Sequence, residues 1–372
     1  MKILTVFGTR PEAIKIAPLV QQLEKEPGLE SVVCVTAQHR EMLDQVLELF
    51  EIVPDYDLNV MKPNQSVSQI TTNVLLGMEK VLSEVQPDIV LVHGDTTTTF
   101  SSALAAFYQK IPVGHVEAGL RTYNKYSPYP EEMNRVLTGH IAELHFAPTE
   151  RNRRNLLAEG IPEEKIFITG NTVIDALLTV AEKPYEFEDE VLSKIDFGRR
   201  RVITVTCHRR ENLGEHMANI FSAIRDIARE FDDVEIVYPV HLNPKVRAAA
   251  GEILGNTERV HLIEPLQYQP FVNLMAKSHF IITDSGGMQE EAPSLGKPVL
   301  VVRKETERPE AVEAGTVKLA DVERENIYAL AKELLTNQNA YDAMAKAVNP
   351  YGDGKACKRI VNVLKNISLP HP

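Results

Sequence analysis

Short apolar runs alternate with helical patterns along the chain, and this alternation constrains the fold more than any other feature of the sequence. In the first half the apolar runs lie at residues 3–7, 32–36, 89–92, 113–116, 146–148 and 166–170. In the second half they lie at residues 202–206, 235–238, 260–263, 280–283 and 299–302. Strands separated by helices at this spacing are typical of parallel sheets with helices on both faces. We therefore predict an α/β protein with two doubly wound parallel sheets.

The domain organisation follows from the length and from one stretch without strands. A chain of 372 residues is long enough for two domains that each bury a core. Residues 182–198 are acidic, contain Pro184 and lack a strand pattern, so we place them in a linker region. We predict a first domain at residues 1–170, a linker region at 171–200 and a second domain at 201–355. A last helix, at about 356–372, is expected to pack back on the first domain. Two such domains would leave a cleft between them.

The charge and the cysteine content of the chain indicate which partners and which cellular compartment to expect. The chain has 40 basic and 52 acidic residues, a net charge of −12, which argues against nucleic acid or an anionic membrane as the main partner. The three cysteines, Cys34, Cys207 and Cys357, form no C-x-x-C pair and indicate reduced thiols. No apolar run approaches the roughly 18 residues that a membrane span needs. We expect a cytoplasmic protein.

Residues 283–298, with the sequence TDSGGMQEEAPSLGKP, separate two apolar runs and are typical of the crossover in a βαβ unit. Ser285 is expected to cap the helix that follows, while Gly286 and Gly287 let the backbone come close to a ligand. Free amides at a helix start direct partial positive charge at that ligand. The stretch predicts a site for a phosphate-bearing ligand, although a glycine pair can also serve only to turn the chain.

Acidic and basic residues follow the strands of the first half. Arg10 and Lys15 stand near the start of the first helix, where an anion would be held. Asp95 and Glu117 come just after two successive strands, whose carboxyl ends share one edge of a parallel sheet. A third acidic cluster, Glu131 and Glu132, follows after a loop, just before a probable helix. Each acid alone could be a helix cap or a surface group, but three converging on one edge favour a catalytic site.

The turns of the second half are rich in basic residues. His208, Arg209 and Arg210 follow the first strand of that half, and His241 follows the second. Arg308 lies beyond the carboxyl end of the last predicted strand, within reach of the phosphate-bearing ligand predicted at residues 283–298. The second domain therefore supplies groups suited to an anion.

Several chemistries are disfavoured because their motifs are missing. The 11 histidines contain no H-E-x-x-H and the cysteines no C-x-x-C, so no metal site is expected. The sequence also lacks a G-x-G-x-x-G after the first strand, a Walker loop and a G-x-S-x-G elbow. Spacing alone thus predicts two Rossmann-like domains that bind a nucleotide sugar or a similar ligand.

Motifs along nearly the whole chain resemble the non-hydrolysing UDP-N-acetylglucosamine 2-epimerase family. They are FGTRPEAIK (7–15), TAQHREMLDQVL (36–47), HGDTTTT (93–99), GHVEAGLR (114–121), PYPEEMNR (128–135), ITGNTVIDAL (168–177), HRREN (208–212), SGGMQEEAPSLGKPV (285–299), ERPEAVEAGT (307–316) and NPYGDG (349–354). The resemblance implies the two-domain GT-B fold, interconversion of UDP-GlcNAc and UDP-ManNAc, a homodimer, and no metal or nicotinamide cofactor. It also implies that the product supplies ManNAc units for bacterial surface polysaccharide.

The resemblance further implies an elimination mechanism. UDP leaves C1 as the C2 proton is lost, giving 2-acetamidoglucal, and then adds back with protonation on the other face. Asp95, Glu117 and Glu131 match the family's catalytic carboxylates and share the acid and base roles jointly. His208 and Arg10 would stabilise charge on the leaving diphosphate.

The remaining site residues are also carried over from the resemblance. Lys15 and Arg308 would support the diphosphate. Ser285, Gly286 and Gly287 match a phosphate-binding turn. Glu291 matches an acceptor for a ribose hydroxyl, and Phe271 would lie near the uracil.

Some relatives bind a second UDP-GlcNAc as an activator. The residues that would do so are kept here, at Gln38, His39, Arg209 or Arg210, and His241. Glu41 and Asn64 depart from the pattern of such relatives, so allosteric activation stays open.

Three other functions are compatible with parts of this sequence. A GT-B glycosyltransferase would need an acceptor groove and one general base, and a UDP-sugar sensor would need no cluster of acids. A hydrolysing epimerase differs only in letting water capture the intermediate. The three carboxylates favour an epimerase.

Overall fold

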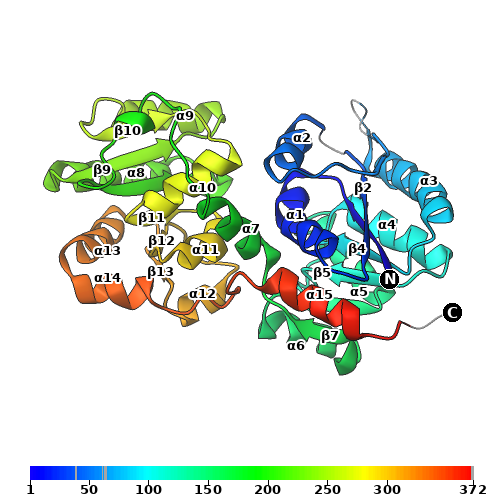
Figure 1. The fold of residues 1–372 in the computed structure, drawn as a ribbon. Helices are drawn as coiled ribbons and strands as arrows, with labels where there is room; N and C mark the ends of the chain where they lie inside the picture. Colours follow the sequence, from blue (N-terminus) through cyan, green and yellow to red (C-terminus); the bar gives the residue numbers. More distant parts are fainter. Residues whose placement is uncertain (38–39, 61, 63–64, 370–372) are drawn as a thin grey trace. The chain divides into compact units, whose positions relative to one another are not determined.

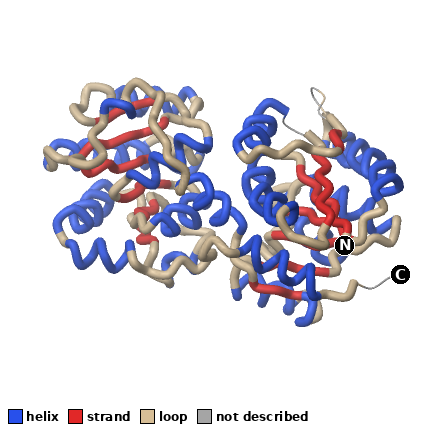
Figure 2. Tube along the Cα trace, viewed as in Figure 1, coloured by secondary structure: helices blue, strands red, loops and turns tan. Residues whose placement is uncertain are grey.

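The computed structural model describes residues 1–37, 40–60, 62 and 65–369 (Figure 1). The chain forms two compact units. The first comprises Met1–Ala176 and Tyr351–Pro372, and the second comprises Leu177–Pro350. The two doubly wound α/β units predicted from the strand pattern are confirmed, and Figure 2 shows helices flanking the strands in each unit.

The first unit contains a parallel sheet of seven strands in the order β3-β2-β1-β4-β5-β6-β7. Their bounds are Lys2–Phe7 for β1, Glu30–Val35 for β2, Tyr56–Asp57 for β3, Ile89–His93 for β4, Val113–Val116 for β5, Leu144–Ala147 for β6 and Ile166–Ile168 for β7. The strand order reverses between β1 and β4. Ligands of open α/β sheets usually bind at the carboxyl ends of the strands on either side of such a reversal. Strand β3 was not predicted, because its two residues have no apolar run.

Helices cover both faces of this sheet. Their bounds are Arg10–Glu24 for α1, Arg40–Leu49 for α2, Val67–Val85 for α3, Thr97–Tyr108 for α4, Glu131–Ile141 for α5, Glu150–Ala158 for α6 and Thr172–Ala181 for α7. Helix α4 packs between α3 and α5, and α1 packs against α2. Leu4, Val6 and Val90 share one buried cluster with apolar residues of α3 and α4. Burial from both sides explains why these strands are continuously apolar.

The C-terminal helix α15, Ala356–Asn366, lies in the first unit and packs against α1. Asp175 fixes its start, because its two carboxylate oxygens accept hydrogen bonds from the amides of Ala356 at 3.1 Å and Cys357 at 2.9 Å. The amide of Asn171 also donates to the carbonyl of Tyr351 at 2.7 Å. The motif around residues 349–354 thus returns the chain to the first unit.

The second unit contains a parallel sheet of six strands in the order β10-β9-β8-β11-β12-β13. The strand bounds are Arg201–Thr206 for β8, Val234–Pro239 for β9, Val260–Ile263 for β10, Phe280–Thr283 for β11, Val299–Val301 for β12 and Val317–Leu319 for β13. The helix bounds are Glu215–Glu230 for α8, Pro244–Leu254 for α9, Tyr268–Lys277 for α10, Gly286–Glu291 for α11, Pro309–Glu313 for α12, Arg324–Thr336 for α13 and Gln338–Ala345 for α14. Strand β13 was not predicted, since Lys318 interrupts its apolar character.

Residues 182–198 pack on the second unit. Phe187 and Phe197 stack with ring centroids 5.3 Å apart, and both contact a buried cluster that includes Leu192, Val202 and Val237. The segment without a strand pattern therefore contributes to a core.

Within the described residues, no helix is both long and apolar enough to cross a bilayer.

Candidate active site

The three acids singled out in the first half lie at one edge of the first sheet. Asp95 follows β4, Glu117 follows β5 directly, and Glu131 is the first residue of α5. The negative charges of Glu117 and Glu131 both raise the pKa of Asp95, so the three carboxyl groups are electrostatically coupled. The carboxyl ends of β4 and β5 bring Asp95 and Glu117 to this edge, as the strand pattern predicts, and the start of α5 adds Glu131.

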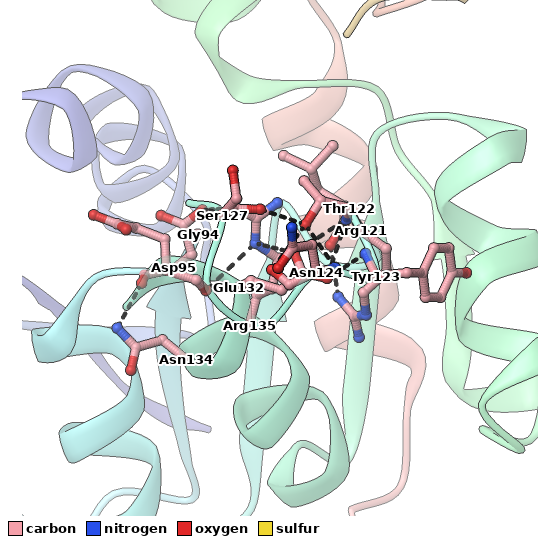
Figure 3. Close-up of polar contacts among 12 residues, drawn as sticks. Gly94, Asp95, Arg121, Thr122, Tyr123, Asn124, Ser127, Glu132, Asn134 and Arg135 are labelled. Carbon is pink, nitrogen blue, oxygen red and sulfur yellow. Dashed lines mark hydrogen bonds and ion pairs between the residues drawn. The ribbon is translucent and has the colours of Figure 1, made fainter. Parts of the chain in front are cut away.

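Asp95 is held by the first turns of α5 (Figure 3). A terminal nitrogen of Arg135 lies 3.1 Å from Asp95 Oδ2, and Asn134 Nδ2 donates to the Asp95 carbonyl at 2.9 Å. Burial raises the pKa of Asp95 to about 6, although the Arg135 charge opposes this shift. A carboxyl group with this pKa can exist in either protonation state near neutral pH.

Glu117 adopts a left-handed backbone conformation with φ of 62°. Residues other than glycine seldom do so, and such conformations concentrate at functional sites. Hydrogen bonds on either side hold it, from Gly94 N to Val116 O at 2.9 Å and from Ala118 N to Phe146 O at 3.0 Å. The conformation is therefore imposed by the strands that flank it.

Two basic side chains approach the Glu117 carboxylate. Lys15 Nζ, from α1, lies 2.6 Å from Glu117 Oε2. His93 Nε2, at the end of β4, lies 3.6 Å from the same oxygen and has no hydrogen bond within the described chain. Burial lowers the pKa of His93 to about 4. Lys15 thus supplies the positive charge, and His93 is a neutral ring beside it.

Two further histidines lie beneath this edge, in register on β5 and β6. They are His115 and His145, and both are fully buried. His115 Nε2 donates to the Gly94 carbonyl at 2.7 Å and so supports the turn that carries Asp95. Burial lowers the pKa of His115 to about 4 and that of His145 to about 3.

Glu12 connects the turns that carry Arg10 and Asp95. Its Oε2 accepts from the amides of Gly8 at 3.1 Å and Thr9 at 2.7 Å. Its Oε1 accepts from the hydroxyls of Thr96 at 2.5 Å and Thr99 at 3.1 Å. Only 3% of Glu12 is exposed, and burial raises its pKa. One carboxylate therefore ties the start of α1 to the start of α4.

Glu132, next to Glu131, has a structural role (Figure 3). Its carboxylate accepts from the amides of Thr122, at 3.0 Å and 3.1 Å, and Tyr123, at 2.8 Å. It is buried, whereas Glu131 is partly exposed and its carboxylate makes no hydrogen bond or ion pair within the part of the chain described here. Of the two neighbouring acids, Glu131 is the one available to a ligand.

In the second unit the stretch from Thr283 forms the predicted βαβ crossover between β11 and β12. Ser285 occupies the N-cap position of α11, but its side chain makes no capping hydrogen bond, so the predicted cap is wrong. The amide of Ser285 instead donates to the hydroxyl of Thr283 at 2.9 Å. The Ser285 hydroxyl is thus not used to cap the helix.

Two arginines flank Gly286 at the start of α11. A Cβ added at Gly286 would lie 3.8 Å from a terminal nitrogen of Arg209 and 4.0 Å from the guanidinium carbon of Arg308. Arg308 is held by an ion pair with Glu290, and Arg209 lies 3.7 Å from Glu307. The missing side chain therefore leaves space between two guanidinium groups and a helix start, which suits a phosphate.

The other predicted residues of this unit lie on neighbouring elements. Glu291 ends α11, with its Oε1 3.3 Å from a Cβ added at Gly287. Phe271 is a partly buried residue of α10. Arg210 is exposed, and His241 stacks on His208 with ring centroids 5.1 Å apart.

Gln38 and His39 lie outside the described residues. The allosteric assignment of Gln38, His39, Arg209, Arg210 and His241 stays a prediction. Arg209 is the member of this set that borders the phosphate turn.

The chain is similar to known proteins in both sequence and structure. The family model described as UDP-N-acetylglucosamine 2-epimerase matches residues 21–365. A UDP-N-acetylglucosamine 2-epimerase of Bacillus subtilis is 61% identical over 98% of this chain and 95% of its own length. The chain belongs to the UDP-N-acetylglucosamine 2-epimerase family.

Solved structures agree with this membership of the epimerase family. A structure from Listeria monocytogenes, 55% identical, superposes with a TM-score of 0.93 over 98% of this chain and 95% of that one. The UDP-GlcNAc 2-epimerase of Neisseria meningitidis bound to UDP-GlcNAc is 56% identical, with a TM-score of 0.84 over 98% of this chain and 100% of that one. The predicted GT-B fold class is confirmed, and the protein is an isomerase of this epimerase family.

Sequence reasoning missed several residues that surround the three acids and the phosphate turn. Glu12, His93 and Arg135 are within or beside the quoted motifs, but their spacing does not reveal that they contact the acids or the turns that carry them. Asp284 was read only as part of the turn. The signal that could have identified His93 and Asp284 is a polar residue directly after each of the apolar runs at residues 89–92 and 280–283.

No group of three or more His, Cys, Asp or Glu side chains that could hold a metal ion occurs among the described residues.

Proposed function

We propose that this protein interconverts UDP-GlcNAc and UDP-ManNAc by eliminating UDP to 2-acetamidoglucal and adding it back. The observation that carries the proposal is a set of coupled carboxyl groups in unlike environments at one sheet edge. Glu117 is ion-paired with Lys15 at 2.6 Å, while the pKa of Asp95 is raised to about 6 by burial. Carboxyl groups whose pKa values are pushed apart by their environments can share the roles of base and acid.

The chemistry at C2 explains why more than one carboxyl group is needed. The C2 proton has no neighbouring carbonyl to make it acidic, so simple removal and return would be slow. Elimination avoids a carbanion: a base takes the proton, the C2–H electron pair forms the C1=C2 bond, and the C1–O pair leaves with UDP. Inversion then requires a proton donor on the opposite face of C2.

Asp95, Glu117 and Glu131 share these proton transfers. In the return step one of them delivers a proton to C2 while a β-phosphate oxygen of UDP attacks C1. The same groups serve both directions, because the base of one direction becomes the acid of the other. Arg135 and Lys15 support the ionised forms of Asp95 and Glu117.

The second unit supplies the groups suited to UDP. The amides at the start of α11, with Arg209 and Arg308 beside Gly286, would hold the diphosphate as it departs and returns. Arg10 and His208 would stabilise its charge, Glu291 would accept from a ribose hydroxyl, and Phe271 would lie near the uracil. The solved Neisseria meningitidis relative bound to UDP-GlcNAc supports this choice of ligand.

The resemblance extends the proposal to the cellular setting. We propose that the enzyme works as a cytoplasmic homodimer and supplies ManNAc units for bacterial surface polysaccharide. The reaction itself needs neither nucleic acid nor a membrane.

The reaction is tested by following UDP-GlcNAc with the purified protein by proton and phosphorus NMR. We expect UDP-ManNAc to appear until both UDP-sugars reach a constant ratio, and the same ratio from UDP-ManNAc. Free ManNAc would identify a hydrolysing enzyme, and an unchanged spectrum would contradict catalysis. Glu117→Gln should reduce the rate by at least ~100-fold, whereas Glu24→Gln, at an exposed residue of α1, should not.

A further inference from the structure

We propose that Asp284 is a positioning residue for His208. Oδ1 of Asp284 keeps the Nδ1–H of the imidazole directed toward the carboxylate, so that Nε2 is the ring atom that contacts the diphosphate. This inference rests on the proposed function, in which His208 stabilises the leaving UDP. It assigns a role to a buried acid that the proton transfers at C2 do not use.

Asp284 is fully buried and lies between β11 and Ser285. Its Oδ2 accepts three hydrogen bonds, from the amides of His208 at 2.9 Å and Arg209 at 2.8 Å and from Asn212 Nδ2 at 3.1 Å. One oxygen therefore fixes the backbone of the His208 turn beside the phosphate turn. A carboxylate is suited to this because it accepts on both oxygens without presenting a donor.

The other oxygen of Asp284 faces the His208 ring. Oδ1 lies 3.7 Å from His208 Nδ1 and has no hydrogen bond within the described residues. A distance of 3.7 Å is beyond a hydrogen bond, but a small rotation of the imidazole would close it. A buried oxygen without a donor is costly, which favours the arrangement in which Nδ1–H turns toward it.

His241 and Cys207 are the other neighbours that bear on the orientation of the His208 ring. His241 stacks on the ring at an interplanar angle of 13°, and its own Nδ1 accepts from the amide of Asn243 at 3.1 Å. The ring of His208 can therefore slide or tilt little on that side. Cys207 keeps its proton, because burial and Asp284 raise the pKa of its thiol, and a thiol is only a weak donor to the Asp284 carboxylate.

The charges around His208 oppose one another. Burial lowers its pKa, Asp284 raises it, and His241 and Arg209 lower it. Without an anion the ring is thus held toward the neutral form, with the Nδ1 proton directed at Asp284. A diphosphate would add negative charge on the far side of the ring and favour the imidazolium, whose Nε2–H can donate to a phosphate oxygen. Asp284 then stabilises the charged ring, as the carboxylate does in a Ser-His-Asp triad.

The full-length wild-type protein provides the first test. Histidine ¹⁵N NMR should show neutral His208 protonated on Nδ1, with the signal assigned by its loss in His208→Asn. Adding UDP alone should raise the midpoint of the His208 titration by about one pH unit or more. A neutral ring protonated on Nε2, or a midpoint that UDP leaves unchanged, would overturn the inference.

Asp284→Asn provides the second test. The amide can present a donor to Nδ1, so the tautomer should change and UDP should bind about tenfold or more weakly at pH 7. Unchanged tautomer and unchanged UDP response in a folded variant would leave Asp284 with a purely structural role and overturn the proposal. If the variant does not fold, the wild-type measurements still decide. None of these measurements requires turnover, so a protein that fails to epimerise would contradict the proposed function separately.

Discussion

Lys15 Nζ lies 2.6 Å from Oε2 of Glu117 and joins α1 to the carboxyl end of β5. The family resemblance implies that Lys15 supports the diphosphate, whereas the structure pairs it with Glu117, a carboxylate proposed to act in proton transfer. The two roles differ in which kinetic constant they affect.

We expect Lys15→Met to lower kcat by roughly 10- to 100-fold with a smaller change in KM, because the carboxylate loses its counter-charge. Steady-state kinetics with UDP-GlcNAc measures both constants. Lys80→Met, at an exposed residue of α3, is the matched control. A large rise in KM with kcat preserved would instead assign Lys15 to the binding of the diphosphate.

Glu12→Gln should destabilise the first unit. The glutamine has one acceptor oxygen for four donors, and its amide nitrogen would face some of them. We expect a loss of about 1–3 kcal/mol in the free energy of unfolding, measured by urea denaturation, together with reduced kcat. Glu24→Gln on the same helix should change neither. Wild-type stability in Glu12→Gln would show that the four hydrogen bonds do not anchor these turns.

His145 should make the protein sensitive to acid. Its pKa is lowered to about 3 by burial, while in the unfolded chain it is expected near 6.5. Below that value the unfolded chain takes up a proton that the folded chain refuses, so stability falls as the pH drops from about 6.5 toward 3. The slope contributed by one such group is about 1.4 kcal/mol per pH unit.

Replacing His145 by leucine should reduce the pH dependence by about that slope between pH 6 and pH 4. Urea denaturation at several pH values measures it. His140→Leu, at an exposed residue of α5, should leave the slope unchanged. Equal slopes in His145→Leu and wild type would mean that His145 is protonated in the folded state.

Gly286→Ala tests the phosphate turn without threatening the fold. The added Cβ would have no neighbour closer than 3.8 Å, so stability should stay within about 0.5 kcal/mol of wild type. The methyl group would occupy the space between the guanidinium groups and the helix start, so UDP should bind about tenfold more weakly by calorimetry. Gly251→Ala, where a Cβ meets nothing within 4 Å, is the control. Unchanged affinity would place the diphosphate elsewhere.

Much of the fold could be predicted because buried parallel strands are apolar on both faces. Strands β3 and β13 escaped prediction since they are two or three residues long and carry polar residues such as Tyr56 or Lys318. Tertiary pairing with β2 and β12 creates them. Local sequence alone holds little information about such pairing.

The site could be predicted only in part. Asp95 and Glu117 follow from strand ends, because topology brings those ends to one edge, whereas Glu131 begins α5 after a loop. The pairing of Lys15 with Glu117 could not be predicted, since it joins residues far apart in the sequence. The absent side-chain cap at Ser285 is a local difference: the Ser285 amide donates to the hydroxyl of Thr283, and the Ser285 hydroxyl caps no amide of α11.

In the proposed reaction, carboxyl groups of the first unit exchange the C2 proton of the sugar with solvent. This exchange can be measured by incubating wild-type protein with UDP-GlcNAc in heavy water and following C2 by NMR. We predict deuterium at C2 of both UDP-GlcNAc and UDP-ManNAc, and at least ~100-fold slower incorporation in Glu117→Gln. UDP-ManNAc that retains the original hydrogen at C2 would contradict the account.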